Sequence, residues 1–187
     1  MNLRNLPTSL IYSRLFLGIL IGLIAIINPV SSGLIIAILM FVGILTDIFD
    51  GIIARKLGVS SEQLRVLDSL VDLFFWLISI GAVFYLVPQF FLTNYVWILL
   101  ILALEFLAYL ISLVKFNKPI ATHTYLAKLW SVFLFCFLAE LAIIQTSTLL
   151  FWVVIILGCI SRLEIIFILR LLKHWKTDVS SIFDVKN

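Results

Sequence analysis

Four aspartates have the residue type and the spacing to do chemistry in a chain that is otherwise mostly apolar. The 187-residue sequence is 64% hydrophobic and only 12% charged. Four of its aspartates fall in one short window, at Asp47, Asp50, Asp68 and Asp72. Carboxylates at the edge of a membrane are costly to place, so they usually mark function. This window is therefore the predicted active site.

The spacing of these aspartates predicts two facing pairs. Asp47 and Asp50 are three residues apart and Asp68 and Asp72 are four apart, so each pair lies on one face of a helix. A loop between the two helices would fold one pair toward the other. Four carboxylates repel one another unless a cation lies between them. Oxygen ligands without a nearby His or Cys favour Mg²⁺ or Mn²⁺, with Ca²⁺ as an alternative, over zinc.

The residues that follow the first pair suit a diphosphate substrate. Gly51 and Ala54 leave room beside the helix, and Arg55 can donate two parallel hydrogen bonds to an oxyanion. Combined with a divalent ion, they predict phosphoryl transfer. The alternative is that the aspartates only cap helices and pair with Arg55, Lys56 and Arg65 in a solvated loop. That reading accounts for one or two aspartates better than for four.

The elements that must position these residues are membrane-spanning helices. Mean hydropathy is +1.24, and apolar stretches reach about 20 residues, the length that a helix needs to cross a bilayer. We therefore predict an all-α integral membrane bundle of six transmembrane helices that forms one domain, 1–187. The predicted spans are 9–28, 33–54, 67–88, 94–115, 124–145 and 149–171.

Lysines and arginines gather on one side of this predicted bundle. The turns at 29–33, 88–94 and 145–148 contain none, whereas the loops 55–66 and 116–123 and both ends of the chain contain most of them. By the positive-inside rule, both termini and these two loops are cytoplasmic, which places the aspartates at the cytoplasmic interface. The net charge of +3 reflects this bias, so membrane lipids with anionic headgroups are the expected partners and nucleic acid is not.

The aspartate window also resembles the signature of the CDP-alcohol phosphatidyltransferase family. That signature is DxxDGxxAR, eight residues, Gly, three residues, Asp, three residues and Asp. Seven of its eight positions match, at Asp47, Asp50, Gly51, Ala54, Arg55, Asp68 and Asp72. The eighth holds Leu64 in place of glycine, which either crowds the nucleotide pocket or marks a branch with another donor. The opening Asn5-Leu6-Pro7-Thr8, with Arg14, is similar to the family's N-terminal stretch.

The resemblance implies a reaction and a role for each matching residue. A CDP-lipid, typically CDP-diacylglycerol, would be attacked by an alcohol acceptor, and CMP would leave. The family pattern implies two divalent ions, Mg²⁺ or Mn²⁺, on Asp47, Asp50, Asp68 and Asp72, with Asp72 also the catalytic base on the acceptor hydroxyl. It implies CDP binding by Asp47, Asp50, Gly51, Ala54, Arg55 and Asp68. It also implies a homodimer.

The acceptor site is predicted from basic residues on the cytoplasmic side. Lys118, His123 and Lys128 could bind an anionic alcohol such as a sugar phosphate or glycerol phosphate. The alternative is that the lysines only determine topology and that the histidine is structural. Both readings stay open.

Two other classes of function compete with the transferase. A divalent-cation transporter would also use aspartates, but it is expected to bind near the bilayer midplane between repeated halves, and no internal repeat is visible. A non-catalytic lipid-binding protein is the other alternative. Charges inside the later spans, Glu105, Arg162 and Glu164, are expected to face a cavity or to pair with one another.

Overall fold

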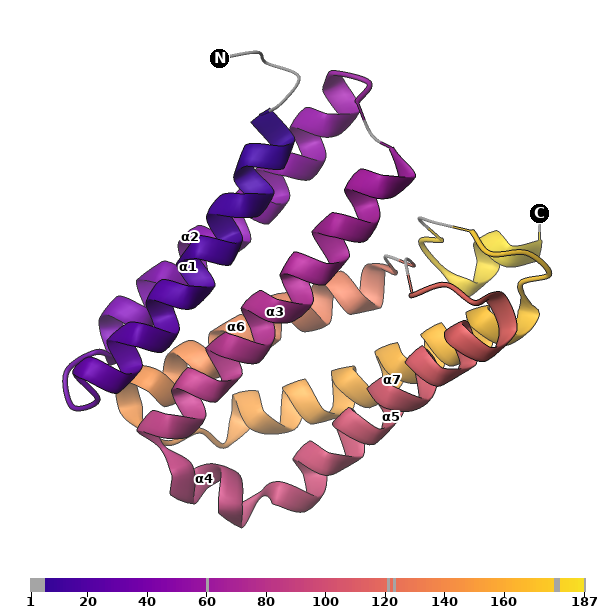
Figure 1. Cartoon of the computed structure of the whole chain (residues 1–187). Helices are drawn as coiled ribbons and strands as arrows, with labels where there is room; N and C mark the ends of the chain where they lie inside the picture. The colour runs from indigo at the N-terminus through magenta and orange to yellow at the C-terminus, as the bar shows by residue number, and fades with distance from the viewer. Residues whose placement is uncertain (1–5, 60, 121, 123, 177–178, 187) are drawn as a thin grey trace. The chain divides into compact units, whose positions relative to one another are not determined.

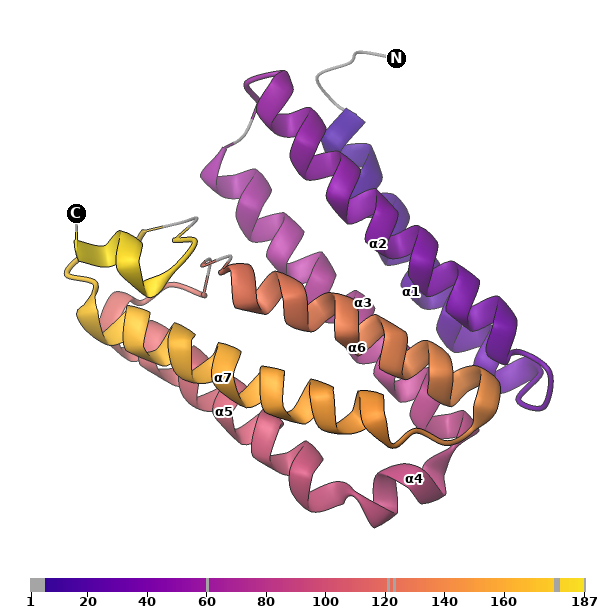
Figure 2. The ribbon, with the colours of Figure 1, turned by 180° about the vertical axis from the view of Figure 1, so that it is seen from behind.

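The computed structural model describes residues 6–59, 61–120, 122, 124–176 and 179–186, and this part of the chain contains helices and no strand. Figures 1 and 2 show the helices from opposite sides. They are α1 (Leu6–Ile27), α2 (Gly33–Lys56), α3 (Glu62–Leu86), α4 (Pro88–Thr93), α5 (Tyr95–Phe116), α6 (Tyr125–Ile144), α7 (Leu149–Leu171) and the 3-10 helix η2 (Ile182–Lys186). The all-α prediction is confirmed.

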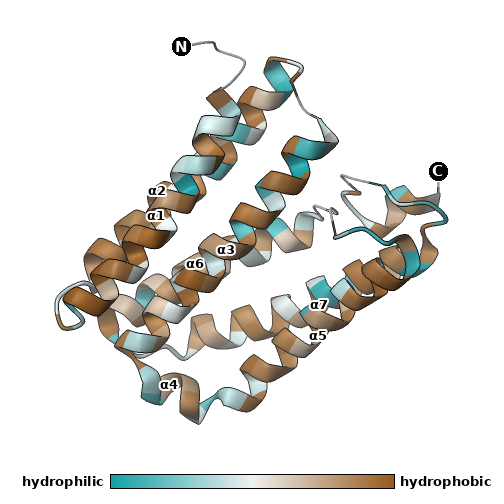
Figure 3. Cartoon of the chain, viewed as in Figure 1, coloured by the Kyte–Doolittle hydropathy of each residue, from teal (hydrophilic) through white to brown (hydrophobic). Residues whose placement is uncertain are grey.

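Six of these helices are long and apolar enough to cross a membrane, which confirms the predicted number of spans. Hydrophobic residues line the long helices, and hydrophilic residues gather around the connection between α2 and α3 (Figure 3). Many large apolar side chains are exposed on the helix surfaces, among them Phe16, Phe106 and Val114. Exposed apolar side chains in such numbers suit a lipid environment rather than water.

The two largest differences from the sequence-based prediction are the start of α3 and the stretch 88–94. The third predicted span started at 67, but α3 begins at Glu62 because the Ser61 hydroxyl accepts a hydrogen bond from the Leu64 amide, 3.1 Å away, and caps the helix. The stretch 88–94, predicted as a turn, is largely the short helix α4, which has Pro88 as its first residue. Proline is favoured there because its missing N–H has no partner in the first turn anyway.

The chain divides into two compact units, which we describe separately. The first contains α1, α2, α3 and Leu138–Thr146, the segment that includes the end of α6. The second contains α5, α7, the earlier part of α6 up to Phe137, and the C-terminal segment. The four aspartates all belong to the first unit.

In the first unit, α1 packs along both α2 and α3, while α2 and α3 contact each other much less. Small residues allow this packing, as is common between membrane helices. The buried ring of Phe75 on α3 fills the space that a side chain at Gly43 of α2 would take, and it also lies against Gly18 of α1. Phe75 is therefore the point where the three helices meet.

The connection that follows α2 begins with a glycine cap. Gly58 has a φ of 64°, a left-handed conformation that most side chains disfavour. Its amide donates to the Arg55 carbonyl oxygen, and the Val59 amide donates to the Ala54 carbonyl oxygen. These bonds end the helix directly after the arginine of the predicted site. The backbone therefore turns away just past the predicted nucleotide-binding residues.

In the second unit, α5 packs against α7 around Ala108, Ile165, Ile166 and Leu169. Arg162 of α7 forms an ion pair with Glu105 of α5, and its guanidinium lies 4.3 Å from the centre of the Trp130 ring. The expected pairing of charges inside the spans is thus observed for these two residues. Membrane-embedded charges are stabilised by such pairing.

Candidate active site

Two helices of the first unit present the four aspartates to one another. Asp47 and Asp50 lie near the end of α2, and Asp68 and Asp72 lie in the first half of α3. Their side chains differ in exposure: Asp50 is 4% exposed, Asp68 22%, Asp72 27% and Asp47 45%. The cluster therefore has one closed side, at Asp50, and one open side, at Asp47.

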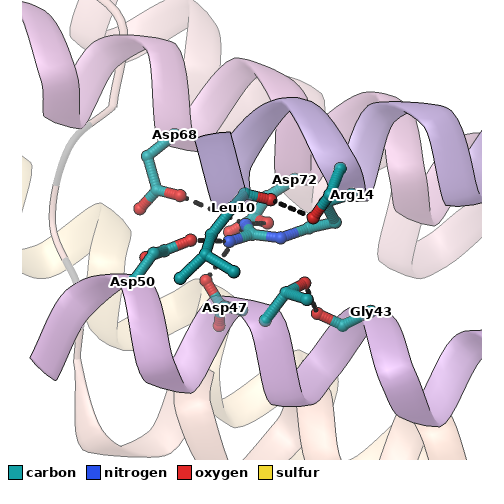
Figure 4. Close-up of polar contacts among 9 residues, drawn as sticks. Leu10, Arg14, Gly43, Asp47, Asp50, Asp68 and Asp72 are labelled. Atoms are coloured by element: carbon teal, nitrogen blue, oxygen red, sulfur yellow. Dashed lines mark hydrogen bonds and ion pairs between the residues drawn. The ribbon is translucent and has the colours of Figure 1, made fainter. Parts of the chain in front are cut away.

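A fifth residue, Arg14 of α1, lies at the centre of the cluster (Figure 4). Its Nη1 atom is 3.1 Å from Oδ1 of Asp47 and 3.1 Å from Oδ1 of Asp68, and it also pairs with Asp72. Its Nη2 atom pairs with Asp50. The side chain of Arg14 is only 1% exposed. One buried guanidinium therefore contacts all four carboxylates.

The packing of α1 explains how Arg14 reaches both pairs. Because α1 packs along α2 and α3, a long side chain from α1 can extend between the two aspartate-bearing helices. This role is not evident from the sequence, where Arg14 is tied only to the N-terminal stretch of the family resemblance. Its position inside the first predicted span, 9–28, was the signal that could have revealed it, because membrane-embedded charges are usually paired or functional.

The carboxylates fit a divalent metal ion. Asp47, Asp50 and Asp68 each offer one oxygen, and these three oxygens lie within 4.8 Å of one another. Hard cations such as Mg²⁺ and Mn²⁺ prefer such an all-oxygen set. Asp72 joins the same cluster through Arg14. The geometry thus groups three of the four predicted ligands, Asp47, Asp50 and Asp68, and it also places a protein cation among them.

The predicted nucleotide-binding residues lie together at the end of α2. A Cβ at Gly51 would be 3.5 Å from Nη1 of Arg55, so the arginine side chain folds back beside the glycine. Ala54 is buried with 8% exposure, whereas Arg55 is exposed. An exposed arginine beside a face without a side chain can donate two hydrogen bonds to a phosphate.

Leu64, the departure from the family signature, lies in the first turn of α3 and is half-buried. Its backbone amide is used by the Ser61 cap. It precedes Asp68 by four residues, so the two residues share one face of α3. Its side chain is therefore on the face of the helix that carries the aspartates.

The predicted acceptor residues belong to the second unit. Lys118 places its ammonium 4.2 Å from the centre of the Trp175 ring, and the Trp175 indole donates to the Pro119 carbonyl oxygen, 2.9 Å away. Lys128 is exposed in the first turn of α6. His123 lies outside the described residues. Lys118 and Lys128 are thus both exposed, and Lys118 is also engaged with an aromatic ring.

Residues 4–174 match the family model described as CDP-alcohol phosphatidyltransferase, which covers most of the chain. Comparison with curated proteins and with solved structures gave no match. The family match includes all four aspartates, Arg14 and the six long helices. The six spans together with this match make the chain an integral multi-pass membrane protein.

Proposed function

Because the chain belongs to the CDP-alcohol phosphatidyltransferase family, we propose that it moves a phosphatidyl group from a CDP-lipid, CDP-diacylglycerol, to an alcohol acceptor and releases CMP. The observation that carries this proposal is the convergence of four carboxylates from α2 and α3. A cluster with this much negative charge at the edge of a membrane is costly, and the single charge of Arg14 does not balance four carboxylates, so a further cation is expected there. A diphosphate donor needs such a cation.

Each aspartate of the cluster then has a role in the reaction. Asp47, Asp50, Asp68 and Asp72 would hold two ions, Mg²⁺ or Mn²⁺. When bound, these ions supply charge neutralisation at the diphosphate and at the departing CMP. Asp72, which is 27% exposed, accepts the proton of the acceptor hydroxyl as that oxygen attacks phosphorus. The bond to CMP breaks as the new phosphodiester bond forms.

The end of α2 would bind the CDP group. Arg55 is exposed and can donate to a phosphate, while Gly51 and the buried Ala54 keep this end of the helix free of large side chains. We place this site at the cytoplasmic interface, since Arg55, Lys56 and Arg65 surround the α2–α3 connection. Lys128, with His123 and Lys118, remains the proposed acceptor region, and the protein is proposed to act as a homodimer.

The experiment that tests this function uses the purified full-length protein in detergent. CDP-diacylglycerol, Mg²⁺ or Mn²⁺ and a panel of soluble alcohols, including sugar phosphates and glycerol phosphate, are mixed with the protein, and CMP and lipid products are measured. We expect one alcohol to give CMP and a new phospholipid in equal amounts. No product with any acceptor, combined with Mn²⁺ uptake into vesicles that contain the protein, would favour a cation transporter instead.

A further inference from the structure

Arg14 has no assigned part in the proposed reaction, yet it occupies the middle of the predicted metal site. It is among the largest fully buried side chains of the described residues. All of its contacts to the aspartates use the two terminal nitrogens, Nη1 and Nη2. Its Nε atom is buried and finds no hydrogen-bond partner among the described residues. A buried donor without a partner costs free energy, and departure of the side chain would relieve that cost.

The charges in the cluster do not balance. One guanidinium carries a single positive charge, whereas the four carboxylates that it contacts carry four negative charges when ionised. Arg14 thus reduces the repulsion between the carboxylates without cancelling it. The remaining negative charge can still attract a divalent ion, and the exposed side chain of Asp47 gives such an ion an approach.

Arg14 and a metal ion need the same oxygens. The three carboxylates that could share one ion, Asp47, Asp50 and Asp68, are all paired with Arg14. Nη1 of Arg14 lies 3.1 Å from Oδ1 of both Asp47 and Asp68, so an ion held by these oxygens would meet the guanidinium as well as its charge. The Arg14 guanidinium and a metal ion therefore compete for these oxygens. Their relative affinities decide which of the two is bound.

We propose that Arg14 is a positioning residue that acts as an internal counter-cation: it holds the four carboxylates together while no divalent ion is bound, and it competes with that ion for them. This inference rests on the proposed metal site. Arg14 then lowers the affinity of the site for metal while it stabilises the protein without metal. The metal concentration at which the enzyme becomes loaded is set by this competition.

The competition predicts opposite effects of one substitution. In R14Q the carboxylates lose their counter-cation, so the metal-free protein loses stability, because removal of one partner leaves buried charges uncompensated. The same loss makes the site more negative, so a divalent ion binds more tightly. A purely structural arginine would give the first effect without the second.

The experiment measures Mn²⁺ affinity and thermal unfolding of the purified full-length protein in detergent, with and without Mn²⁺ or Mg²⁺. We expect R14Q to bind Mn²⁺ roughly tenfold more tightly than wild type, as for directly coupled members of one charge network. Without metal, R14Q should unfold at a lower temperature than wild type. Addition of metal should raise its unfolding temperature by more than it raises that of wild type. R14K keeps the charge but loses the planar guanidinium, so its Mn²⁺ affinity and unfolding temperature should lie between those of wild type and R14Q. K56Q is the matched control, because Lys56 is an exposed cation at the end of α2, and it should match wild type.

The outcomes separate this inference from the proposed function. Equal or weaker Mn²⁺ binding by R14Q, with normal binding by wild type, overturns the role of Arg14 alone. No Mn²⁺ binding by wild type overturns the metal-dependent function itself. If R14Q folds only when metal is present, R14K decides the question: tighter binding than wild type supports the competition, and unchanged binding overturns it.

Discussion

At the scale of single residues, Asp68 offers a direct test of the carboxylate cluster. It contacts Arg14, belongs to the group of three possible metal ligands, and is partly exposed. Asp68→Asn keeps the shape of the side chain but removes its negative charge. We expect CMP release to fall by on the order of a hundredfold or more, the usual cost of losing one group that stabilises charge in a transition state. Asp184→Asn, the same change on the exposed surface of η2, should leave the rate unchanged.

Leu64 is the second residue whose replacement is informative. If its side chain crowds the nucleotide pocket, Leu64→Gly should lower the apparent KM for CDP-diacylglycerol. The added backbone freedom in the first turn of α3 should cost about 0.5–1 kcal/mol of stability, so unfolding must be followed in parallel. A lower turnover of the native donor without tighter CDP-lipid binding would instead indicate that Leu64 contacts a different donor. If turnover, KM and CDP-lipid binding were all unchanged, Leu64 would not contact the donor.

The residues show which parts of the site can be predicted from sequence. Aspartate spacing placed each pair of carboxylates on one face of its helix, because positions three and four apart share a face whatever the neighbouring helices do, and the loop between the helices predicted that the pairs would meet. Arg14 could not be joined to them in the same way. It is 33 residues before Asp47, and only the packing of α1 along both α2 and α3 brings it into the cluster. Contacts of this kind depend on tertiary structure rather than on local pattern.

At the scale of elements, the contact of Gly43 with Phe75 aligns the two aspartate-bearing helices. Gly43 is one turn before Asp47 on α2, and Phe75 is one turn after Asp72 on α3. A methyl group at position 43 would overlap the buried ring. We expect Gly43→Ala to destabilise the protein by about 1–3 kcal/mol, as overpacking does, and to weaken Mn²⁺ binding.

The matched control for that change is Gly81→Ala on α3. A Cβ there would meet no atom within 4 Å among the described residues. Alanine is also the better helix former, so this variant should be at least as stable as wild type. Equal loss of stability in both variants, measured by thermal unfolding, would show that the Gly43–Phe75 contact does not align the helices.

The helices themselves were predicted more accurately than their ends. Six apolar stretches fixed the number of spans, because the bilayer sets a minimum length. Hydropathy could not locate the start of α3, since its first turn is polar and begins at a serine cap rather than at an apolar residue. The short helix α4 was missed because Pro88 signals a turn as readily as a first helical residue.

At the scale of the whole molecule, the proposed orientation can be tested by labelling. Native Cys136 and Cys159 are first replaced by serine, and single cysteines are introduced at Ser31 and Leu57, both exposed, on either side of α2. Ser31 is preferred to its neighbour Ser32, which is fully buried. A membrane-impermeant thiol reagent should label Leu57→Cys from the cytoplasm and Ser31→Cys from the opposite side. Labelling of both from the same side would contradict the proposed topology.

The central claim, that this membrane protein releases CMP from a CDP-lipid by a metal-dependent reaction, is tested most directly by one measurement. CMP release from CDP-diacylglycerol is followed with the purified wild-type protein and its acceptor alcohol, first in saturating EDTA and then after Mg²⁺ or Mn²⁺ is restored in excess. The carboxylate cluster predicts that release stops in EDTA and returns with the ion, because the carboxylates alone repel the diphosphate. Full CMP release in saturating EDTA would contradict the claim.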